Sequence, residues 1–130
     1  RTLPDLMKNK KICCITSRNE IKNILQKYDV TILQIPGKNE NQFSSFSNII
    51  EKINTTALDF DLWLIAAGEL GRVYPGLIKF KGGRAFDVGS LIDYWCNQEV
   101  PSRLIPYMKQ TENPLKLELT DEGKEYLKYL

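Results

Sequence analysis

This sequence predicts an α/β fold in which a mainly parallel sheet lies between two layers of helices. Short apolar segments alternate along the chain with segments of helical periodicity, the pattern of βαβ units. The apolar segments lack polar alternation, as expected of strands that helices cover on both faces. Residues 61–95 show the pattern most clearly, because two apolar strands flank one helical segment and end at glycine or acidic residues.

The first βαβ unit is predicted near the N-terminus. Residues 11–16 (KICCIT) form an apolar run with β-branched residues, which indicates a buried strand. Isoleucine, leucine and tyrosine then recur at helical spacing over 19–28, with Ser17 or Asn19 as the N-cap. A second strand, residues 30–35 (VTILQI), ends at a Pro-Gly pair.

The next unit combines a helix with the strand that follows it. A polar loop leads into residues 43–53, where phenylalanine and isoleucine repeat at helical spacing. Residues 62–67 (LWLIAA) then form an apolar strand that stops at Gly68.

The segment 70–81 has apolar residues at helical spacing but contains Pro75, which has no backbone N–H to donate. A helix therefore either begins near Pro75 after a turn or kinks there. A fourth strand is predicted over 85–88 (AFDV), and a further helix begins over 91–95.

Beyond Cys96 the pattern weakens, and three prolines mark loops. We expect a short helix over 103–108 and an edge strand over 115–119, where leucines alternate with charged residues. A final helix is predicted over 121–129, with Thr120 as its N-cap and acidic residues in its first turn.

Composition restricts the classes of function. With 130 residues, of which 42% are hydrophobic and 26% charged, residues 1–130 are expected to form a single Rossmann-like domain. A net charge of +2 gives no reason to expect nucleic acid as a partner. The absence of histidine excludes Ser-His-Asp and Cys-His catalysis and His-ligated metals. Acid–base chemistry would therefore use carboxylate, lysine, tyrosine or cysteine side chains.

The cysteine pattern favours a reducing compartment. Cys13 and Cys14 are adjacent on a predicted strand and point to opposite faces, so they cannot both contact Cys96. Because zinc-ligand spacing is absent as well, we expect buried reduced thiols in a cytoplasmic protein. The N-terminus shows no signal-peptide pattern, and no apolar run approaches the ~20 residues that span a bilayer.

Three lysines, Lys8, Lys10 and Lys11, form the densest basic cluster and flank the first predicted strand. They are either a solvated approach to that strand or a contact for lipid or phosphate. Peripheral association with the inner face of a membrane therefore stays open.

Candidate functional residues gather at the predicted carboxyl ends of the strands, where open parallel sheets bind ligands. Gly68 and Gly71 lie in the turn after the third strand, where glycines let a ligand approach the backbone. Glu69 suits a sugar hydroxyl, a metal or a general-base role, whereas it would repel a phosphate. The alternative is a purely structural turn.

The fourth strand ends in Asp87-Val88-Gly89-Ser90, and Asp93 follows. An aspartate at a strand end can accept hydrogen bonds from ribose or sugar hydroxyls, so we expect Asp87 to be functional together with Gly89 and Ser90. A turn or helix-capping role is the alternative for Asp87, and Asp93 could either contribute to the site or cap the helix that begins there.

The first strand is followed by Ser17-Arg18-Asn19, where a dinucleotide-binding domain or a methyltransferase would carry a glycine-rich loop. This departure argues against a nicotinamide cofactor. Ser17 and Arg18 either hold a phosphate, since arginine offers bidentate donors, or serve as a helix cap and a surface side chain.

Other motifs are open to two interpretations. Lys38 and Asn41 either line a nucleotide pocket or belong to a plain polar loop. Asp59-Phe60-Asp61 has a D-x-D form known from metal sites, but it precedes a strand and is expected at the opposite edge, as a turn. Trp63 is expected in the core, and Tyr94-Trp95 could stack on a sugar or a base.

Several short motifs form a set along the first three quarters of the chain. They are Ile12 to Ser17, the Ile35-Pro36 turn with Asn41-Gln42-Phe43, Ile65-Ala66-Ala67-Gly68, Gly82-Gly83, and Ala85-Phe86-Asp87-Val88-Gly89-Ser90 with Asp93-Tyr94-Trp95. This set resembles the GT-D-type glycosyltransferase domain found in bacterial surface-polysaccharide and adhesin-glycan clusters. The likeness covers residues 6–95 and leaves 96–130 as a C-terminal extension.

The resemblance implies a domain that binds a nucleotide-sugar donor and transfers the sugar to a glycan or glycolipid acceptor. Transfer needs a divalent metal, Mn²⁺ or Mg²⁺, or a cationic group to neutralise the leaving diphosphate. It also needs a base for the acceptor hydroxyl, for which Glu69 and Asp87 are the candidates.

The resemblance also implies an acidic Asp-x-Glu element, thought to hold the metal, ahead of the first strand. Here Asp5 has no glutamate two positions further on. Two expectations follow. Either the chain is part of a glycosyltransferase whose acidic element lies outside this sequence, or it is a non-catalytic partner or scaffold domain of a polysaccharide-assembly complex.

Overall fold

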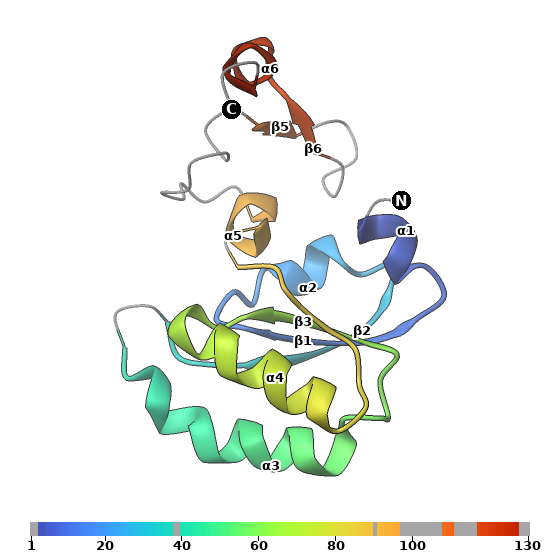
Figure 1. The fold of residues 1–130 in the computed structure, drawn as a ribbon, viewed down its shortest axis with the longest axis vertical. Helices are drawn as coiled ribbons and strands as arrows, with labels where there is room; N and C mark the ends of the chain where they lie inside the picture. The colour runs from blue at the N-terminus through green and yellow to red at the C-terminus, as the bar shows by residue number, and fades with distance from the viewer. Residues whose placement is uncertain (1–2, 38–39, 90, 97–107, 111–116, 128–130) are drawn as a thin grey trace.

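The central feature of the fold is a four-stranded parallel sheet in the order β2-β1-β3-β4 (Figure 1). The computed structural model describes residues 3–37, 40–89, 91–96, 108–110 and 117–127. The strands are β1 (Lys11–Thr16), β2 (Asp29–Gln34), β3 (Leu62–Ala66) and β4 (Ala85–Asp87). The predicted parallel α/β sheet is confirmed, with each strand within one residue of its predicted bounds.

Helices cover both faces of this sheet, which makes the predicted three layers (Figure 1). One face carries α1 (Leu3–Met7), α2 (Ile21–Ile24) and α5 (Leu91–Trp95); the other carries α3 (Phe46–Thr56) and α4 (Val73–Phe80). Two 3-10 helices, η1 (Gln42–Ser45) and η2 (Gly68–Arg72), lead into α3 and α4.

Alternation along the strands explains why both faces of the sheet are apolar. Ile12 and Cys14 of β1 pack with α1, α2 and α5, whereas Cys13 and Ile15 pack with α3 and α4. The two adjacent cysteines therefore point to opposite faces, as predicted. Since each face of β1 is buried, a polar residue at any of these positions would need an internal partner.

The helix predicted over 19–28 is wrong in length, because only Ile21–Ile24 is α-helical. The preceding residues form tighter i→i+3 bonds, from the N–H of Ile21 to the C=O of Arg18 and from Lys22 to Asn19. This turn already brings Ile21 and Leu25 into the core, so a longer helix is not needed. The N-cap is residue Glu20, so the predicted caps, Ser17 and Asn19, are also wrong.

The position of Pro75 follows from where α4 begins. The helix starts at Val73, directly after η2, so Pro75 lies in its first turn. Backbone N–H groups there have no partner within the helix, so proline costs no hydrogen bond. Of the two alternatives for this segment, the start near Pro75 after a turn is confirmed.

The C-terminal residues form a second, antiparallel sheet of β5 (Met108–Gln110) and β6 (Leu117–Leu119), followed by α6 (Asp121–Leu127). The expected edge strand and final helix are thus confirmed over these ranges. Residues 103–107 of the predicted short helix lie outside the described residues, and Met108 belongs to a strand instead. No helix within the described ranges is long and apolar enough to cross a bilayer.

The end of α3 packs closely against β3 and the glycine turn before β4. Trp63 is fully buried, as predicted, and its Nε1–H donates to the carbonyl of Ala57 at 3.1 Å. A Cβ added to Gly83 would lie 3.0 Å from that carbonyl oxygen and 2.7 Å from Cγ2 of Ile78. The second glycine of this turn is therefore required by packing.

We predict that Gly83→Ala lowers the free energy of unfolding by about 1–3 kcal/mol, because the methyl group has no space. The matched control is Gly76→Ala on the exposed side of α4, where no atom lies within 4 Å of the added Cβ. The control should raise the free energy of unfolding by about 0.5–1 kcal/mol through helix propensity. Urea denaturation measures both, and equal effects would contradict this account.

A second prediction concerns the thiols of β1. Burial raises the pKa of Cys13 and of Cys14 from 9.0 to about 12. Above pH 9 the unfolded chain therefore loses these two protons while the folded chain keeps them, so stability falls as pH rises toward 12. The loss should reach at most about 1.4 kcal/mol per pH unit for each thiol.

Urea denaturation at pH 8 and pH 10 measures this loss in the wild type and in a Cys13→Ala/Cys14→Ala variant. The variant should be less stable at pH 8 but should lose less stability between the two pH values. An identical decline in both proteins would show that the thiols do not contribute.

Candidate functional site

The strand order places the candidate site between β1 and β3. From β1 the chain passes to β2 on one side, and from β2 it returns to β3 on the other side of β1. Doubly wound sheets bind ligands outside the carboxyl ends of the strands at such a switch point. Here Ser17 and Arg18 follow β1, and Gly68 and Glu69 follow β3.

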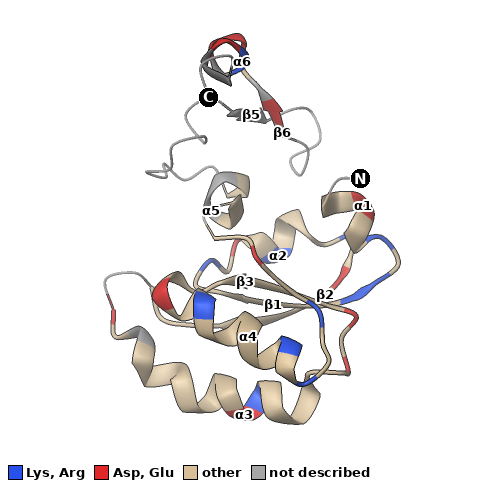
Figure 2. Cartoon of the chain, in the orientation of Figure 1, with Lys and Arg blue, Asp and Glu red and all other residues tan. Residues whose placement is uncertain are grey.

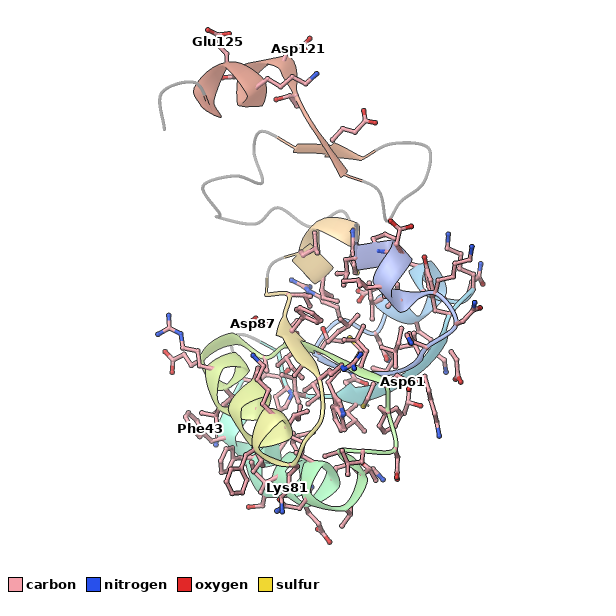
Figure 3. All side chains as sticks on the ribbon, turned by 45° about the vertical axis from the view of Figure 1, so that its right-hand side comes forward. Phe43, Asp61, Lys81, Asp87, Asp121 and Glu125 are labelled. Carbon is pink, nitrogen blue, oxygen red and sulfur yellow. The ribbon has the colours of Figure 1, made fainter. Side chains whose placement is uncertain are left out.

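The strand register brings the fourth strand to the same edge. Thr16 pairs with Ala66, and Ile65 pairs with Asp87, so β1, β3 and β4 end side by side. Figure 3 shows Asp87 and Asp61 at opposite ends of the sheet. The structure therefore collects the predicted residues of three strand ends at one edge, which we call the carboxyl edge.

Asp87 and Gly71 are neighbours at the carboxyl edge. A Cβ added to Gly71 would lie 3.5 Å from Oδ2 and 3.6 Å from Oδ1 of Asp87, so any other residue at position 71 would place its side chain against the carboxylate. Oδ1 of Asp87 also accepts the N–H of Gly89 at 3.0 Å, and Gly89 has a φ of +42°. Asp87 itself remains exposed, so its second oxygen is open to a ligand.

The turn after β3 presents a second carboxylate. Gly68 has a φ of +55°, a conformation that other residues rarely adopt, and it lets the chain turn directly from β3 into η2. Glu69 follows it, exposed and without a hydrogen-bond or ion-pair partner in the part of the chain described. Its carboxylate is therefore available to a ligand.

The turn after β1 depends on a residue that sequence reasoning missed. Thr16 is only 1% exposed, and its Oγ1 accepts the backbone N–H of Arg18 at 3.1 Å. The sequence feature that could have identified Thr16 is a hydroxyl residue at the end of an apolar strand, a position typical of side chain–backbone turns. Ser17 and Arg18 are half-buried here, and Ser17 does not cap a helix.

The remaining candidates have different positions. Ser90 and Lys38 lie outside the described residues, whereas Asp93 lies on α5 with its side chain outside them. Asn41 accepts the N–H of Phe43 and caps η1, which is a structural role. Trp95 is buried in the core and offers no ring face for stacking.

The opposite, amino edge of the sheet contains a mixed-charge concavity of about 800 Å³. As predicted, Asp61 lies at this edge, where its carboxylate accepts the N–H of Lys11 at 2.8 Å. The lining includes Lys8, Lys10, Lys11 and Lys27 together with Asp5, Asp29 and Asp61. Figure 2 shows basic residues along the loop between α1 and β1. Since three aspartates balance most of this positive charge, the concavity is not a purely basic site.

Burial reduces the number of side chains that can act as an acid or a base at neutral pH in the described part of the chain. The pKa of Cys13, Cys14 and Tyr74 is raised by desolvation, so these groups stay protonated at neutral pH. Tyr74 lies stacked on Phe46 with ring centroids 6.0 Å apart. The exposed carboxylates at the carboxyl edge are therefore better placed for proton transfer than the thiols or this phenol.

The carboxyl edge does not form a complete metal cage. No group of three His, Cys, Asp or Glu residues gathers within the described ranges. Magnesium-type ions often use one or two carboxylates plus substrate phosphates, and this edge presents Glu69 and Asp87 among the side chains that the structure describes. The residues therefore fit a metal only if a phosphorylated ligand supplies further oxygens.

Comparison with protein-family models, curated proteins and solved structures finds no match to this chain. The chemistry of the carboxyl edge therefore has to follow from its own residues. Two left-handed glycines, an aspartate hydrogen-bonded to Gly89 and a glutamate without a partner among the described residues suit a ligand that bears several hydroxyl groups, since carboxylates accept hydrogen bonds and repel anions.

We predict that Thr16→Val, which keeps the shape of the side chain, lowers the free energy of unfolding by about 1–3 kcal/mol. The reason is that the N–H of Arg18 loses its acceptor where the edge is partly closed to water. Urea denaturation measures the loss, with Thr31→Val on the exposed face of β2 as the control. If both variants are equally stable, the hydroxyl does not hold this turn.

Proposed function

We propose that this domain binds a nucleotide-sugar at the carboxyl edge, as the donor-binding core of a glycosyltransferase. The observation that carries the proposal is that Asp87, at the end of β4, lies beside Gly71 in the segment that follows β3. The position of these turns beside the switch point supports it, since doubly wound sheets bind nucleotides there. The resemblance of residues 6–95 to GT-D-type domains supports it independently.

In this proposal different residues contact different parts of the nucleotide-sugar donor. Ser17 and Arg18 face the diphosphate, with Arg18 as the charged donor. Gly68 and Gly89 let the donor approach the backbone, and Glu69 and Asp87 contact its hydroxyls or act as the base. Mn²⁺ or Mg²⁺ would neutralise the leaving diphosphate. Ser90 and Asp93, which follow Gly89 in the sequence, are proposed as further donor-binding residues.

The acceptor is proposed to be a glycan or a glycolipid. A lipid-linked acceptor requires contact with a membrane surface, and the exposed Lys8 and Lys10 would supply it. In this arrangement the protein works in the cytoplasm at the inner face of the membrane.

The second candidate is a non-catalytic partner or scaffold domain of a polysaccharide-assembly complex. The observation in its favour is that the described residues gather no three metal-ligating side chains. The missing Asp-x-Glu pattern around Asp5 points the same way.

Titration calorimetry with UDP-, GDP- and CMP-sugars, with and without Mn²⁺, separates the two candidates. We expect saturable binding of one donor, and Asp87→Ala should reduce it at least tenfold, the loss of a charged hydrogen bond. Asp59→Ala, which removes an exposed aspartate at the amino edge, is the matched control and should leave binding intact. If no donor binds the wild type under either condition, the scaffold role is favoured.

A further inference from the structure

The outward face of α4 is apolar although it is exposed. Tyr74 and Ile78 on the inner side of this helix are fully buried in the core. On the outer side Val73, Gly76 and Phe80 follow one another at i, i+3 and i+7, which places them in one stripe. Phe80 is 84% exposed and Val73 is 45% exposed. Helices that are apolar on all sides are normally buried, so the outer face of α4 is expected to have a partner.

The stripe contains a gap between its two large side chains. No atom lies within 4 Å of a Cβ added to Gly76, so the space above the helix is open there. Leu58, which is 71% exposed, extends the apolar area at the end of α4, since it lies beside Gly82 in the turn that follows. We call Val73, Gly76, Phe80 and Leu58 the α4 surface.

The charged residues around the α4 surface are mostly basic. No residue between Gly71 and Phe86 is acidic, whereas four exposed residues of this segment are basic: Arg72, Lys79, Lys81 and Arg84. Figure 2 shows them on α4, at its start and on the loop that leads to β4. Their side chains have no ion-pair partner in the part of the chain described. The acidic residue next to the surface is Asp59, which follows Leu58. These charges favour an acidic partner and oppose pairing with a second copy of the same surface.

We propose that the α4 surface binds an amphipathic helix of a partner protein that has acidic residues beside its apolar stripe. Apolar side chains of the partner at i, i+3 or i+4, and i+7 would pack on Val73 and Phe80, and one of them would enter the gap above Gly76. Its acidic residues would pair with the basic residues of this segment. The α4 surface lies outside the carboxyl edge, so this inference goes beyond the proposed nucleotide-sugar site and does not depend on it.

The glycine in the stripe favours a helix over an anionic lipid surface as the occupant. The affinity of an amphipathic helix for lipid increases with its exposed apolar area, to which a glycine adds almost nothing. A glycine between two large side chains instead lets another backbone approach closely. The two occupants therefore respond in opposite directions when the gap is filled.

The experiment uses a synthetic amphipathic helix as the probe, with leucines at i, i+3, i+4 and i+7 and glutamates on both flanks. A second peptide has lysine in place of every glutamate. Titration calorimetry with the full 130-residue chain should show saturable binding of the glutamate peptide and at least tenfold weaker binding of the lysine peptide. The Lys79→Glu/Lys81→Glu variant should reverse this preference.

Two variants test the apolar contacts. Phe80→Ser and Gly76→Leu should each weaken binding of the glutamate peptide at least tenfold, the first by removing an anchor and the second by filling the gap. Gly76→Leu adds apolar area, so it would strengthen binding to vesicles of phosphatidylglycerol if lipid were the occupant. The matched control is Phe86→Ser on β4, where Phe86 is 46% exposed and pairs in register with Leu64 of the other core cluster. This control should keep the wild-type affinity.

The outcomes separate the possible occupants. The inference is overturned if the glutamate peptide does not bind, if both peptides bind equally, or if Gly76→Leu leaves peptide binding unchanged. Vesicle binding that increases in Gly76→Leu would assign the surface to lipid. Self-association that Phe80→Ser abolishes, measured by analytical ultracentrifugation, would assign it to a second copy. Binding of a nucleotide-sugar should be the same in Phe80→Ser as in the wild type, so either proposal can fail without the other.

Discussion

The parallel pairing of β1 with β3 is the constraint on which the rest of this structure depends. It joins the strand–helix unit that runs to β2 with the one that runs to β4, and it buries both faces of the two central strands. Parallel strands need long connections, which here carry the helices over the sheet. The same pairing aligns the strand ends, so that turns from distant parts of the sequence share one edge.

This alignment explains why small residues and carboxylates occur together at the carboxyl edge. Each strand delivers its own turn to that edge. Gly71 leaves space beside the Asp87 carboxylate, since an added Cβ there would lie 3.5 Å from Oδ2, and the N–H of Gly89 is hydrogen-bonded to Oδ1. The site is therefore a product of sheet register together with local turn chemistry.

The sequence was sufficient to predict the parallel sheet, because strands that are buried on both faces consist of continuous apolar residues. It also located Trp63 in the core and the D-x-D turn at the opposite edge, since both follow from strand direction alone. The length of α2 was not predictable in this way, because the tight turn after Arg18 depends on tertiary packing of Ile21 and Leu25.

The proximity of Gly71 to Asp87 was also beyond sequence reasoning. Both residues were expected at the site, but which residues of the two turns would be neighbours depends on packing across β3 and β4. Thr16 was overlooked because a hydroxyl at the end of an apolar run resembles an ordinary strand residue. A hydroxyl residue at such a position is typical of side chain–backbone turns, but the N–H that donates to it is identified only by the structure.

The strands that carry the turns of the carboxyl edge differ in how many neighbouring strands they pair with. β3 lies between two strands, whereas within the described residues β4 spans three residues and pairs with β3 alone. A short terminal strand of this kind opens at a lower free energy than the sheet interior, so its amides should exchange with solvent by local separation from β3. A ligand that contacts the turns after both β3 and β4 would stabilise β4 against this local separation. Binding of the ligand would therefore be measured as slower deuterium uptake along β4.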